Sequence, residues 1–333
     1  MTRFSDVIKF IIFVSLSVFY SSFIAFALLL VYIFKKSLFE VKDRPNPPAP
    51  LTGNEFGVHK FANVNGIKLH YVEKGDPKNP LIVFVHGFPE FWYSWRHQLK
   101  EFSKDYWTIA IDQRGYGQSD KPSNVSEYHV DNMADDINAL VKSLGREKFI
   151  LVAHDWGAAI GFNYVYRYTE TLEKYIMIGG PTTQAWKKLV TGSVKQFIMS
   201  WYVFFFQMPI LPETALRMQD LRAFETMKLG TAEDIECFKY TFAKKDALTY
   251  PINYYRAIRV LDPDRRLPRP QNPVPGLLLL GEYDKYISRE TGSLAMQELA
   301  RLEFNIIKGA NHFAQQHKPD ETNRMIREFL EKN

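Results

Sequence analysis

The sequence predicts an α/β fold: a mostly parallel, eight-stranded sheet with helices on both faces and one inserted group of helices. Short, continuous apolar runs alternate with helical patterns along most of the 333 residues. Continuous apolar runs are typical of strands covered on both faces, and strand–helix alternation implies parallel pairing. The alternation fails over 181–269, where only aromatic-rich helical patterns occur. A chain of this length accommodates one core with such an insertion.

The expected elements follow one another in order. Residues 56–72 alternate apolar and polar side chains, which predicts an antiparallel hairpin at the edge of the sheet. The clearest helix is expected over 127–144, where apolar residues form one face and Gly145 ends the pattern. A last helix begins after Pro319. The apolar runs expected as parallel strands are 81–85, 107–111, 149–153, 175–178, 277–280 and 304–307.

The N-terminal segment predicts a membrane anchor. Residues 10–34 carry no charged side chain, and at about 1.5 Å per residue this stretch crosses a bilayer about 30 Å thick. A cleaved signal peptide is the alternative, because Ala25-Phe26-Ala27 resembles a cleavage site. The apolar run continues past that site to Phe34, which favours a retained signal anchor with a single pass through the membrane.

The side of the membrane that the rest of the chain occupies stays open. Fewer basic residues precede the apolar run than follow it, which favours a cytoplasmic position for the C-terminal part. The glycosylation sequon Asn124-Val125-Ser126 is usable only if that part is luminal. The same residues equally fit a helix start with Ser126 as the cap.

We therefore expect four parts in this chain. The anchor occupies 1–36, and a stiff, Pro-rich linker occupies 37–55. The α/β core is formed by 56–180 together with 270–333. The helical insertion over 181–269 is expected as a lid above the strand ends, where open α/β sheets bind their ligands.

Composition excludes several classes of function. The net charge of +5 is scattered rather than gathered in a Lys/Arg block, so no nucleic-acid partner is expected. Cys237 is the only cysteine, so no intrachain disulfide forms, and no Cys/His spacing resembles a zinc site. The sequence therefore implies neither a metal ion nor a cofactor.

The segment Ala153-His154-Asp155-Trp156-Gly157 carries the strongest functional signal. It follows an apolar run and precedes a helical pattern, so we expect it at a sharp turn from a strand into a helix. Small residues lie two positions on either side of Asp155, as in a nucleophile elbow, where the strained turn needs small residues and serine is the usual central residue.

An aspartate at such a turn changes the chemistry. A carboxylate is already ionised near neutral pH, so it attacks carbon without help from a base. The product of that attack is an alkyl ester of the enzyme. The substrate must therefore carry a leaving group on saturated carbon, as an epoxide or a carbon–halogen bond does. The alternative is that Asp155 only caps the helix that follows it.

Two further strand ends supply partners for this carboxylate. Asp284 and His312 each follow an apolar run, and their order after Asp155 is nucleophile, acid, histidine. Glu282 is a rival for the acid, although the spacing fits Asp284 better. His154 adjoins the nucleophile but is expected to point away from it along the strand, which indicates a structural role.

Two backbone N–H groups are expected to form an oxyanion hole. His86-Gly87-Phe88-Pro89 directly follows the apolar run 81–85, and in an elbow enzyme this loop supplies one donor. The residue after the nucleophile, Trp156, supplies the other. Pro89 has no N–H group, so Phe88 is the expected donor in the loop.

These motifs resemble those of the epoxide hydrolases of the α/β-hydrolase superfamily, from about Phe56 to the C-terminal end. With its anchor, the chain resembles the membrane-bound animal branch of that family. The segments that carry the resemblance are His86-Gly87-Phe88-Pro89-Glu90 with Trp92-Tyr93-Ser94-Trp95-Arg96, Asp112-Gln113-Arg114-Gly115-Tyr116-Gly117-Gln118-Ser119, His154-Asp155-Trp156-Gly157, and Asn311-His312-Phe313 with Lys318-Pro319.

The resemblance implies further residues and a location. Two lid tyrosines hold the epoxide oxygen in this family, and Tyr202 and Tyr255 lie in segments that resemble theirs, with Tyr254 as an adjacent rival. Ala158 stands where many relatives carry a second glycine. The membrane that holds the anchor is expected to be that of the endoplasmic reticulum.

The implied function is the hydrolysis of apolar or lipid-like epoxides to vicinal diols through an aspartyl-alkyl ester. The nearest alternative is a haloalkane or haloacid dehalogenase, which shares the aspartate nucleophile. A catalytically silent, membrane-tethered binding protein is the second alternative. A serine esterase is excluded, because no Gly-x-Ser-x-Gly occurs in the chain.

Overall fold

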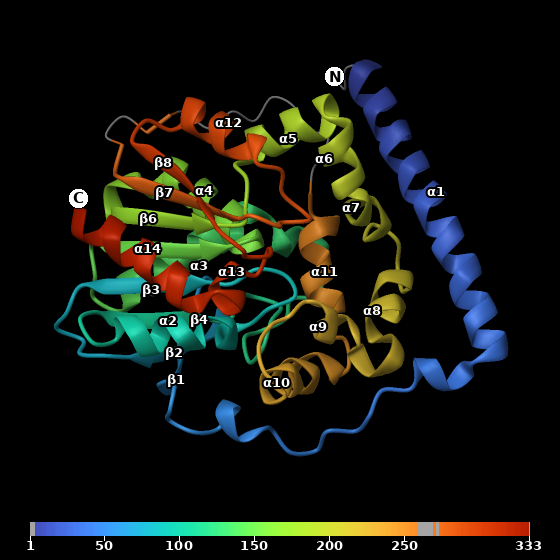
Figure 1. Cartoon of the computed structure of the whole chain (residues 1–333), viewed down its shortest axis with the longest axis horizontal. Coiled ribbons are helices and arrows are strands. Elements are labelled where there is room, and N and C mark those ends of the chain that lie inside the picture. Colours follow the sequence, from blue (N-terminus) through green and yellow to red (C-terminus); the bar gives the residue numbers. More distant parts are fainter. Residues whose placement is uncertain (1–3, 259–268, 271–272, 333) are drawn as a thin grey trace.

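The computed structural model describes residues 4–258, 269–270 and 273–332. Within them, one eight-stranded sheet has the spatial order β1-β2-β4-β3-β5-β6-β7-β8 (Figure 1). β2 pairs antiparallel with both β1 and β4, and the other neighbours are parallel. The strands are β1 (Val58–Val64), β2 (Ile67–Lys74), β3 (Leu81–Val85), β4 (Trp107–Ile111), β5 (Phe149–His154), β6 (Leu172–Ile178), β7 (Gly276–Gly281) and β8 (Leu302–Ile307). The predicted fold class is confirmed.

Most parallel strands coincide with the apolar runs of the sequence. β3 and β4 span the expected residues and are buried throughout. β6 differs, because it begins at Leu172 rather than at Tyr175. Glu173 is exposed and Lys174 is half-buried, so polar residues interrupt the start of this strand. The continuous apolar run at 175–178 therefore corresponds only to the second half of β6, which is buried.

Helices cover both faces of the sheet. α2 (Arg96–Phe102) and α14 (Pro319–Lys332) lie together on one face, and α3 (Val130–Ser143) and α4 (Trp156–Tyr168) lie together on the other (Figure 1). α12 (Glu290–Glu298) packs beside β8 at the end of the sheet. Both faces of the central strands are thereby removed from water, which explains their continuous apolar sequences.

Helix α3 begins later than the sequence periodicity predicted. Residues Val125–Tyr128 form a short 3-10 helix, and the His129 side chain caps α3 by accepting a hydrogen bond from the N–H of Asp131. Asn124 caps the 3-10 helix, because its Oδ1 accepts from the N–H of Ser126 at 3.1 Å. The expectation that Ser126 is the cap is therefore wrong.

Between β6 and β7 the described residues form helices and no strand, as the sequence predicted. These inserted helices lie beside the edge of the sheet at which β5 ends (Figure 1). Residues 259–268 of the predicted insertion and 1–3 of the predicted anchor lie outside the described residues. The inserted helices are α5 (Thr183–Gly192), α6 (Val194–Met199), α7 (Trp201–Phe205), α8 (Leu211–Leu221), α9 (Ala223–Thr226), α10 (Ala232–Ala243) and α11 (Thr249–Arg256).

The N-terminal helix α1 (Phe4–Phe34) is long and apolar enough to cross a membrane, judged by length and composition. It lies along the inserted helices α7 and α8 (Figure 1). The segment that follows returns along α8, and Arg44 forms ion pairs with Asp220 on α8 and with Glu236 on α10. Helix α1 and the segment that follows it are thus in direct contact with the inserted helices.

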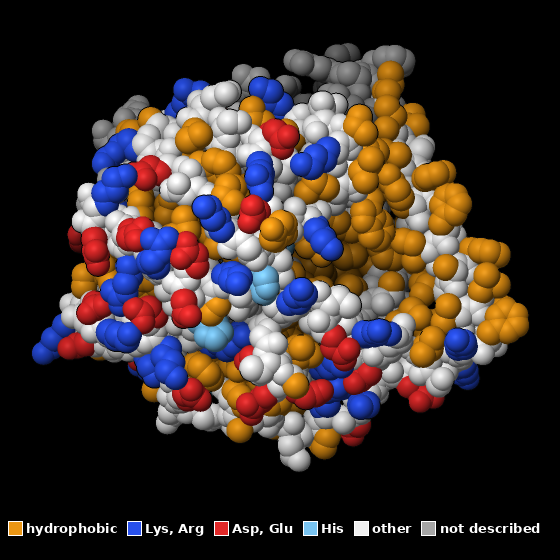
Figure 2. Space-filling view, viewed as in Figure 1, with side chains coloured by type: hydrophobic (Ala, Val, Ile, Leu, Met, Phe, Trp, Pro, Cys, Tyr) orange, Lys and Arg blue, Asp and Glu red, His pale blue; other side chains and the backbone are white. Residues whose placement is uncertain are grey.

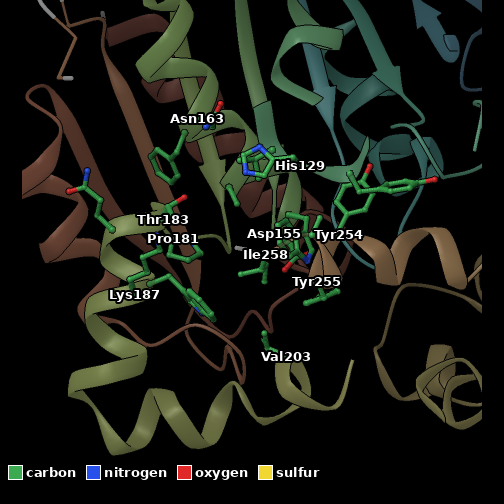
Figure 3. A pocket seen from close by; sticks show the side chains of 18 of the residues that line it. His129, Asp155, Asn163, Pro181, Thr183, Lys187, Val203, Tyr254, Tyr255 and Ile258 are labelled. Carbon is green, nitrogen blue, oxygen red and sulfur yellow. The ribbon is translucent and has the colours of Figure 1, made fainter. Parts of the chain in front are cut away.

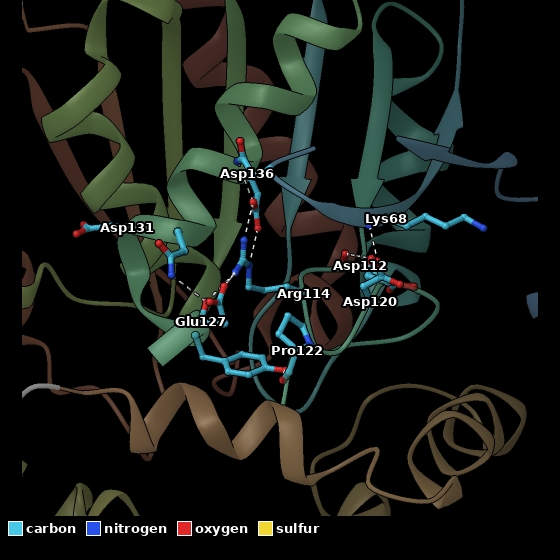
Figure 4. Close-up of polar contacts among 12 residues, drawn as sticks. Lys68, Asp112, Arg114, Asp120, Pro122, Glu127, Asp131 and Asp136 are labelled. Carbon is cyan, nitrogen blue, oxygen red and sulfur yellow. Dashed lines mark hydrogen bonds and ion pairs between the residues drawn. The ribbon is translucent and has the colours of Figure 1, made fainter. Parts of the chain in front are cut away.

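A buried ion pair holds the turn that follows β4 (Figure 4). Arg114 donates hydrogen bonds to both carboxylate oxygens of Asp136 on α3, at 2.7 and 2.8 Å. The two side chains are only 3% and 4% exposed. At the start of the turn, Asp112 accepts hydrogen bonds from the backbone N–H groups of Trp92 and Gln118. The turn is therefore fixed to α3 and to the loop after β3.

Replacing Arg114 with Met is expected to lower the free energy of unfolding by about 3–5 kcal/mol, because Asp136 would remain buried without its charged partner. Arg324→Met is the matched control. Arg324 is half exposed and pairs with Glu321 and Glu328 at the surface, so its loss should change stability far less. Urea denaturation of both variants in detergent measures the difference, and equal losses would contradict this account of the turn.

Candidate active site

Asp155 occupies a strained turn between β5 and α4. Its backbone has φ 52° and ψ −116°, a conformation that costs a residue other than glycine about 1–3 kcal/mol. Neighbouring glycines make room for this turn. A Cβ on Gly157 would lie 2.3 Å from the carbonyl oxygen of Val85, and a Cβ on Gly87 would lie 2.4 Å from the Cβ of Asp155. Close packing of two loops therefore requires the small residues.

The Asp155 carboxylate does not cap α4. It forms no side-chain hydrogen bond with the first turn of that helix. Instead, its Oδ1 accepts a hydrogen bond from the N–H of Phe88 at 2.7 Å, and its Oδ2 lies 3.3 Å from Nε2 of His312. The helix-cap alternative is therefore wrong, and the carboxylate is held between a backbone amide and an imidazole.

His312 and Asp284 meet at the ends of β8 and β7. Oδ2 of Asp284 lies 2.7 Å from Nδ1 of His312. The other oxygen, Oδ1, accepts hydrogen bonds from the N–H groups of Tyr286 and Ile287 at 2.8 and 2.9 Å, which fix the carboxylate. The rival Glu282 instead accepts from a backbone N–H in the loop after β8. The geometry thus brings Asp284, and not Glu282, to the histidine.

These charges shift one another's pKa values. Burial lowers the pKa of His312, but the carboxylates of Asp284 and Asp155 outweigh burial and raise that pKa to about 10. Burial likewise raises the pKa of Asp155, but the hydrogen bond and charge of His312 outweigh it and hold this pKa below its ordinary value. The resting site therefore contains an ionised Asp155 beside a protonated His312.

One of the two predicted oxyanion donors contacts the Asp155 carboxylate. Phe88 donates its N–H to Oδ1, as described above. Trp156 is the first residue of α4, and an N–H at that position has no carbonyl partner within its own helix. Because Oδ1 is held by Phe88, Oδ2 is the oxygen left to react with a substrate.

Tyr202 on α7 and Tyr255 on α11 line the same pocket as Asp155. Figure 3 shows Tyr255 beside Asp155. Their ring centroids are 5.8 Å apart. Burial raises the pKa of both hydroxyls well above 10, so both remain protonated and able to donate hydrogen bonds. The hydroxyl of the rival Tyr254 is already engaged, because it donates to the carbonyl oxygen of Arg114 at 2.8 Å.

The pocket beside Asp155 has a volume of about 180 Å³ and is mainly apolar. Its walls come from α4 and from the inserted helices α5, α7 and α11. Phe162, Trp186, Val203 and Ile258 supply apolar and aromatic surface, and Figure 3 shows several of these walls around Asp155. Such a lining suits an apolar substrate.

Sequence reasoning assigned no role to a buried carboxylate behind the site, that of Glu90. One oxygen, Oε2, accepts from the N–H of Gly87 at 2.8 Å and lies 2.6 Å from Nδ1 of His154. The other, Oε1, accepts from the side-chain amides of Gln315 and Gln316 on α13 (Ala314–His317), each at 2.8 Å. Glu90 thus joins the oxyanion loop to the histidine loop. The sequence held one signal for this role: Glu90 is an ionisable residue directly after Pro89, within an otherwise apolar segment.

His154 extends this connection. Its Nε2 lies 3.0 Å from the carbonyl oxygen of His312, so the ring lies between Glu90 and the backbone of the histidine loop. These contacts agree with the structural role expected for His154.

Sequence reasoning also assigned no role to Tyr286. The ring centroid of Tyr286 lies 4.8 Å from that of His312 and 5.6 Å from that of Tyr202. In the described part of the chain, no three His, Cys, Asp or Glu side chains are grouped as metal ligands would be.

Comparison with known proteins places the chain in a family. A family model described as alpha/beta hydrolase fold matches residues 80–319. An epoxide hydrolase 1 of Caenorhabditis elegans is 36% identical over 309 residues, which cover 89% of this chain and 75% of that protein. An epoxide hydrolase 3 of Xenopus tropicalis is 37% identical over 316 residues, which cover 89% of this chain and 84% of that protein.

Solved structures agree with these relatives. An epoxide hydrolase of Bacillus megaterium in complex with an inhibitor matches with a TM-score of 0.74 and 31% identity, over 82% of this chain and 100% of that one. An epoxide hydrolase of Vigna radiata matches with a TM-score of 0.72 and 28% identity, over 84% of this chain and 100% of that one. The chain belongs to the α/β-hydrolase fold family and, within it, to the epoxide hydrolases.

Proposed function

We propose that this protein hydrolyses apolar or lipid-like epoxides to vicinal diols through an aspartyl-alkyl ester. One observation carries the proposal: an ionised Asp155 shares an apolar pocket with the hydroxyls of Tyr202 and Tyr255, and the His312–Asp284 pair lies directly behind it. This reaction needs a nucleophile, donors for the epoxide oxygen and a base. The relatives named as epoxide hydrolases support the same conclusion.

In the first step, Oδ2 of Asp155 attacks a ring carbon and the carbon–oxygen bond of the epoxide breaks. Negative charge develops on the epoxide oxygen, and the hydroxyls of Tyr202 and Tyr255 donate hydrogen bonds to it. A proton from one of them converts this oxygen to a hydroxyl group, and the tyrosinate left behind takes up the proton that His312 releases once the ester has formed. Oδ1 of Asp155 keeps its bond to the N–H of Phe88, so the product is an ester held in a fixed orientation.

In the second step, His312 takes a proton from water, and the resulting hydroxide attacks Cγ of the ester. The N–H groups of Phe88 and Trp156 stabilise the oxyanion. When the bond between Cγ and Oδ2 breaks, the imidazolium of His312 gives its proton to the departing Oδ2 and the diol is released. The new carboxyl group of Asp155 then returns a proton to His312, which restores the resting site. Ester formation prepares this step. The ester of Asp155 is neutral, so it no longer supports the high pKa of His312, and the ring can release its proton and act as a base.

The alternatives left open by the sequence receive less support. A dehalogenase needs N–H donors to bind its halide, and Trp156 and Trp186 do line this pocket. The pocket also contains the two tyrosines, Tyr202 and Tyr255, whose hydroxyls an epoxide oxygen needs and a halide does not. A catalytically silent binding protein has no need for a complete set of hydrogen-bonded groups around Asp155. The curated relatives described above are named as epoxide hydrolases, and neither alternative explains that.

The proposal extends to the organisation of the chain. The insertion over 181–269 acts as the lid, since its described helices supply both tyrosines and close the pocket. The segments 56–180 and 270–333 act as the catalytic core, and 37–55 acts as the linker. This division is supported by the positions of the residues that line the pocket, which come from the core and the insertion alone.

We propose further that α1 is retained and holds the enzyme at a membrane, with the endoplasmic reticulum as the expected one. Cleavage as a signal sequence is the competing interpretation. Helix α1 is long and apolar enough to cross the bilayer in a single pass, as the sequence predicts.

Replacing His312 with Ala should stop the second step and leave the first step possible. With a fatty-acid epoxide, the intact mass of this variant should rise by the mass of the substrate. Diol formation should fall by about 10²–10⁴-fold, the usual contribution of a general base. The double variant Asp155→Ala, His312→Ala is the control and should gain no mass. An unchanged mass for the single variant would refute the ester mechanism.

Replacing Tyr202 or Tyr255 with Phe should slow ring opening by about 10²-fold each, by analogy with the loss of one oxyanion donor. Rapid-quench measurement of ester formation tests this. Tyr254→Phe is the matched control, because its hydroxyl binds the carbonyl of Arg114 and should contribute mainly to stability. If Tyr254→Phe lost more ring-opening rate than Tyr255→Phe, the assignment of Tyr255 would be wrong.

Replacing Asp155 with Asn should lower the pKa of His312 from about 10, because Asn, like the ester, carries no charge. NMR titration of the imidazole measures this pKa, and His312→Gln assigns the signal.

The same shift makes stability depend on pH. The pKa of His312 in the folded protein lies above the ordinary value of 6.5, so the ion pair stabilises the fold fully below pH 6.5, and this stabilisation is lost as pH rises to about 10. Over that interval the wild type should therefore lose more unfolding free energy than Asp155→Asn, and equal losses would contradict the coupling.

A further inference from the structure

The buried side chain of Gln196 joins the inserted helices to the core. Figure 2 shows Lys, Arg, Asp and Glu side chains spread over the face of the molecule that it displays, whereas Gln196 on α6 is only 1% exposed. A polar group in such a place costs free energy unless its hydrogen bonds are made. The partners of this amide therefore indicate what the residue contributes.

Two of these hydrogen bonds go to the backbone of the loop between β7 and α12, residues 282–289, which we call the acid loop because it carries Asp284. Nε2 of Gln196 donates to the carbonyl oxygen of Tyr286 at 2.7 Å, and Oε1 accepts from the N–H of Ser288 at 2.9 Å. Because a carbonyl only accepts and an N–H only donates, the amide fits this pair of groups in one orientation. The lid thus binds the acid loop through a specific pair of contacts.

Asp284 holds the same stretch of backbone within the loop. Its Oδ1 accepts from two backbone N–H groups of the loop, one of them that of Tyr286 at 2.8 Å, and its Oδ2 lies 2.7 Å from Nδ1 of His312. The peptide groups around Tyr286 are therefore bound both by this carboxylate and by the amide of Gln196. Without that amide, two buried backbone groups lose their partner, and the backbone that orients Asp284 is held less firmly.

The ring of Tyr286 extends this connection to both steps of the reaction. Its centroid lies 4.8 Å from that of His312 and 5.6 Å from that of Tyr202, and both pairs are arranged edge to face. Nε2 of Gln196 also donates to Oγ of Ser200 at 3.1 Å, two residues before Tyr202. The base and one donor to the epoxide oxygen therefore contact a single ring, whose backbone is bound by Gln196.

We infer that Gln196 is a positioning residue: it holds the acid loop to the lid, so that Asp284 keeps His312 in place for hydrolysis of the ester. Gln196 does not itself line the pocket beside Asp155, so it acts through the acid loop and not on the substrate. A lid that moves away from the core then also releases the base from its fixed position. The inference rests on the proposed function, because it assigns a role in the second step of that reaction.

The rates of the two steps provide the first test. Gln196→Leu removes both bonds to the acid loop, and Gln196→Asn retains an amide that is one methylene too short to keep both. Gln98→Leu is the matched control, because Gln98 on α2 is a buried amide that donates two hydrogen bonds away from the acid loop. Rapid-quench measurement with a fatty-acid epoxide separates ring opening from hydrolysis of the ester.

Gln196→Leu should slow ester hydrolysis by up to about 10²-fold and ring opening less, since a small misplacement of a catalytic group has this effect. The ester should therefore accumulate during turnover and appear in the intact mass. Gln196→Asn should show a smaller loss in the same step, and it decides the outcome if the Leu variant does not fold. Gln98→Leu should show no selective loss of ester hydrolysis. Equal slowing of both steps by the Gln196 variants would indicate a structural role alone and overturn the inference.

The pKa of His312 provides a second test that needs no substrate. Asp284 helps to raise this pKa to about 10, so Gln196→Leu and Gln196→Asn should lower it, whereas Gln98→Leu should leave it unchanged. NMR titration of the imidazole in the full-length chain measures the shift, and an unchanged pKa in the Gln196 variants would overturn the inference. If no ester forms even in His312→Ala, the proposed function fails, and this titration still decides whether Gln196 positions the histidine.

Discussion

Two carboxylates, those of Asp155 and Asp284, share the imidazolium of His312, and these charges set the pKa values in the site. Asp284 lies 2.7 Å from one nitrogen of His312, and Asp155 lies 3.3 Å from the other. Three parallel strands, β5, β7 and β8, end at one edge of the sheet and bring these residues together. Buried charges persist only where partners surround them, and backbone N–H groups, including that of Phe88, complete the set. A loss of negative charge at Asp155 therefore lowers the pKa of His312 directly.

Local sequence patterns predicted much of this arrangement. Continuous apolar runs located the parallel strands, and small residues on either side of Asp155 located the elbow, because both patterns express constraints that act over a few residues. β6 shows the limit of this reasoning. Its first residues, including the exposed Glu173, lie at the margin of the sheet, where polar side chains are tolerated. Likewise, α3 begins one residue after His129 because a side-chain cap, rather than the apolar periodicity, fixes its start.

Contacts between distant segments were beyond such reasoning. Successive residues on a helix point about 100° apart, so only the packing of α11 separates Tyr255 from Tyr254, whose hydroxyl is bound to the turn after β4. Glu90 connects loops that are far apart in the sequence, and nothing in its local pattern names its partners. The position of α1 was equally hidden, because an apolar helix in isolation carries little information about which side meets the protein.

Helix α7 has two faces with different neighbours, although it is only five residues long. Tyr202 lines the pocket, while Phe204, two residues later, meets the rings of α1. A sideways displacement of α1 therefore reaches Tyr202, the proposed donor to the epoxide oxygen, through a single turn of helix. If the proposed function is correct, a chain without α1 holds the hydroxyl of Tyr202 less firmly than the full-length chain does.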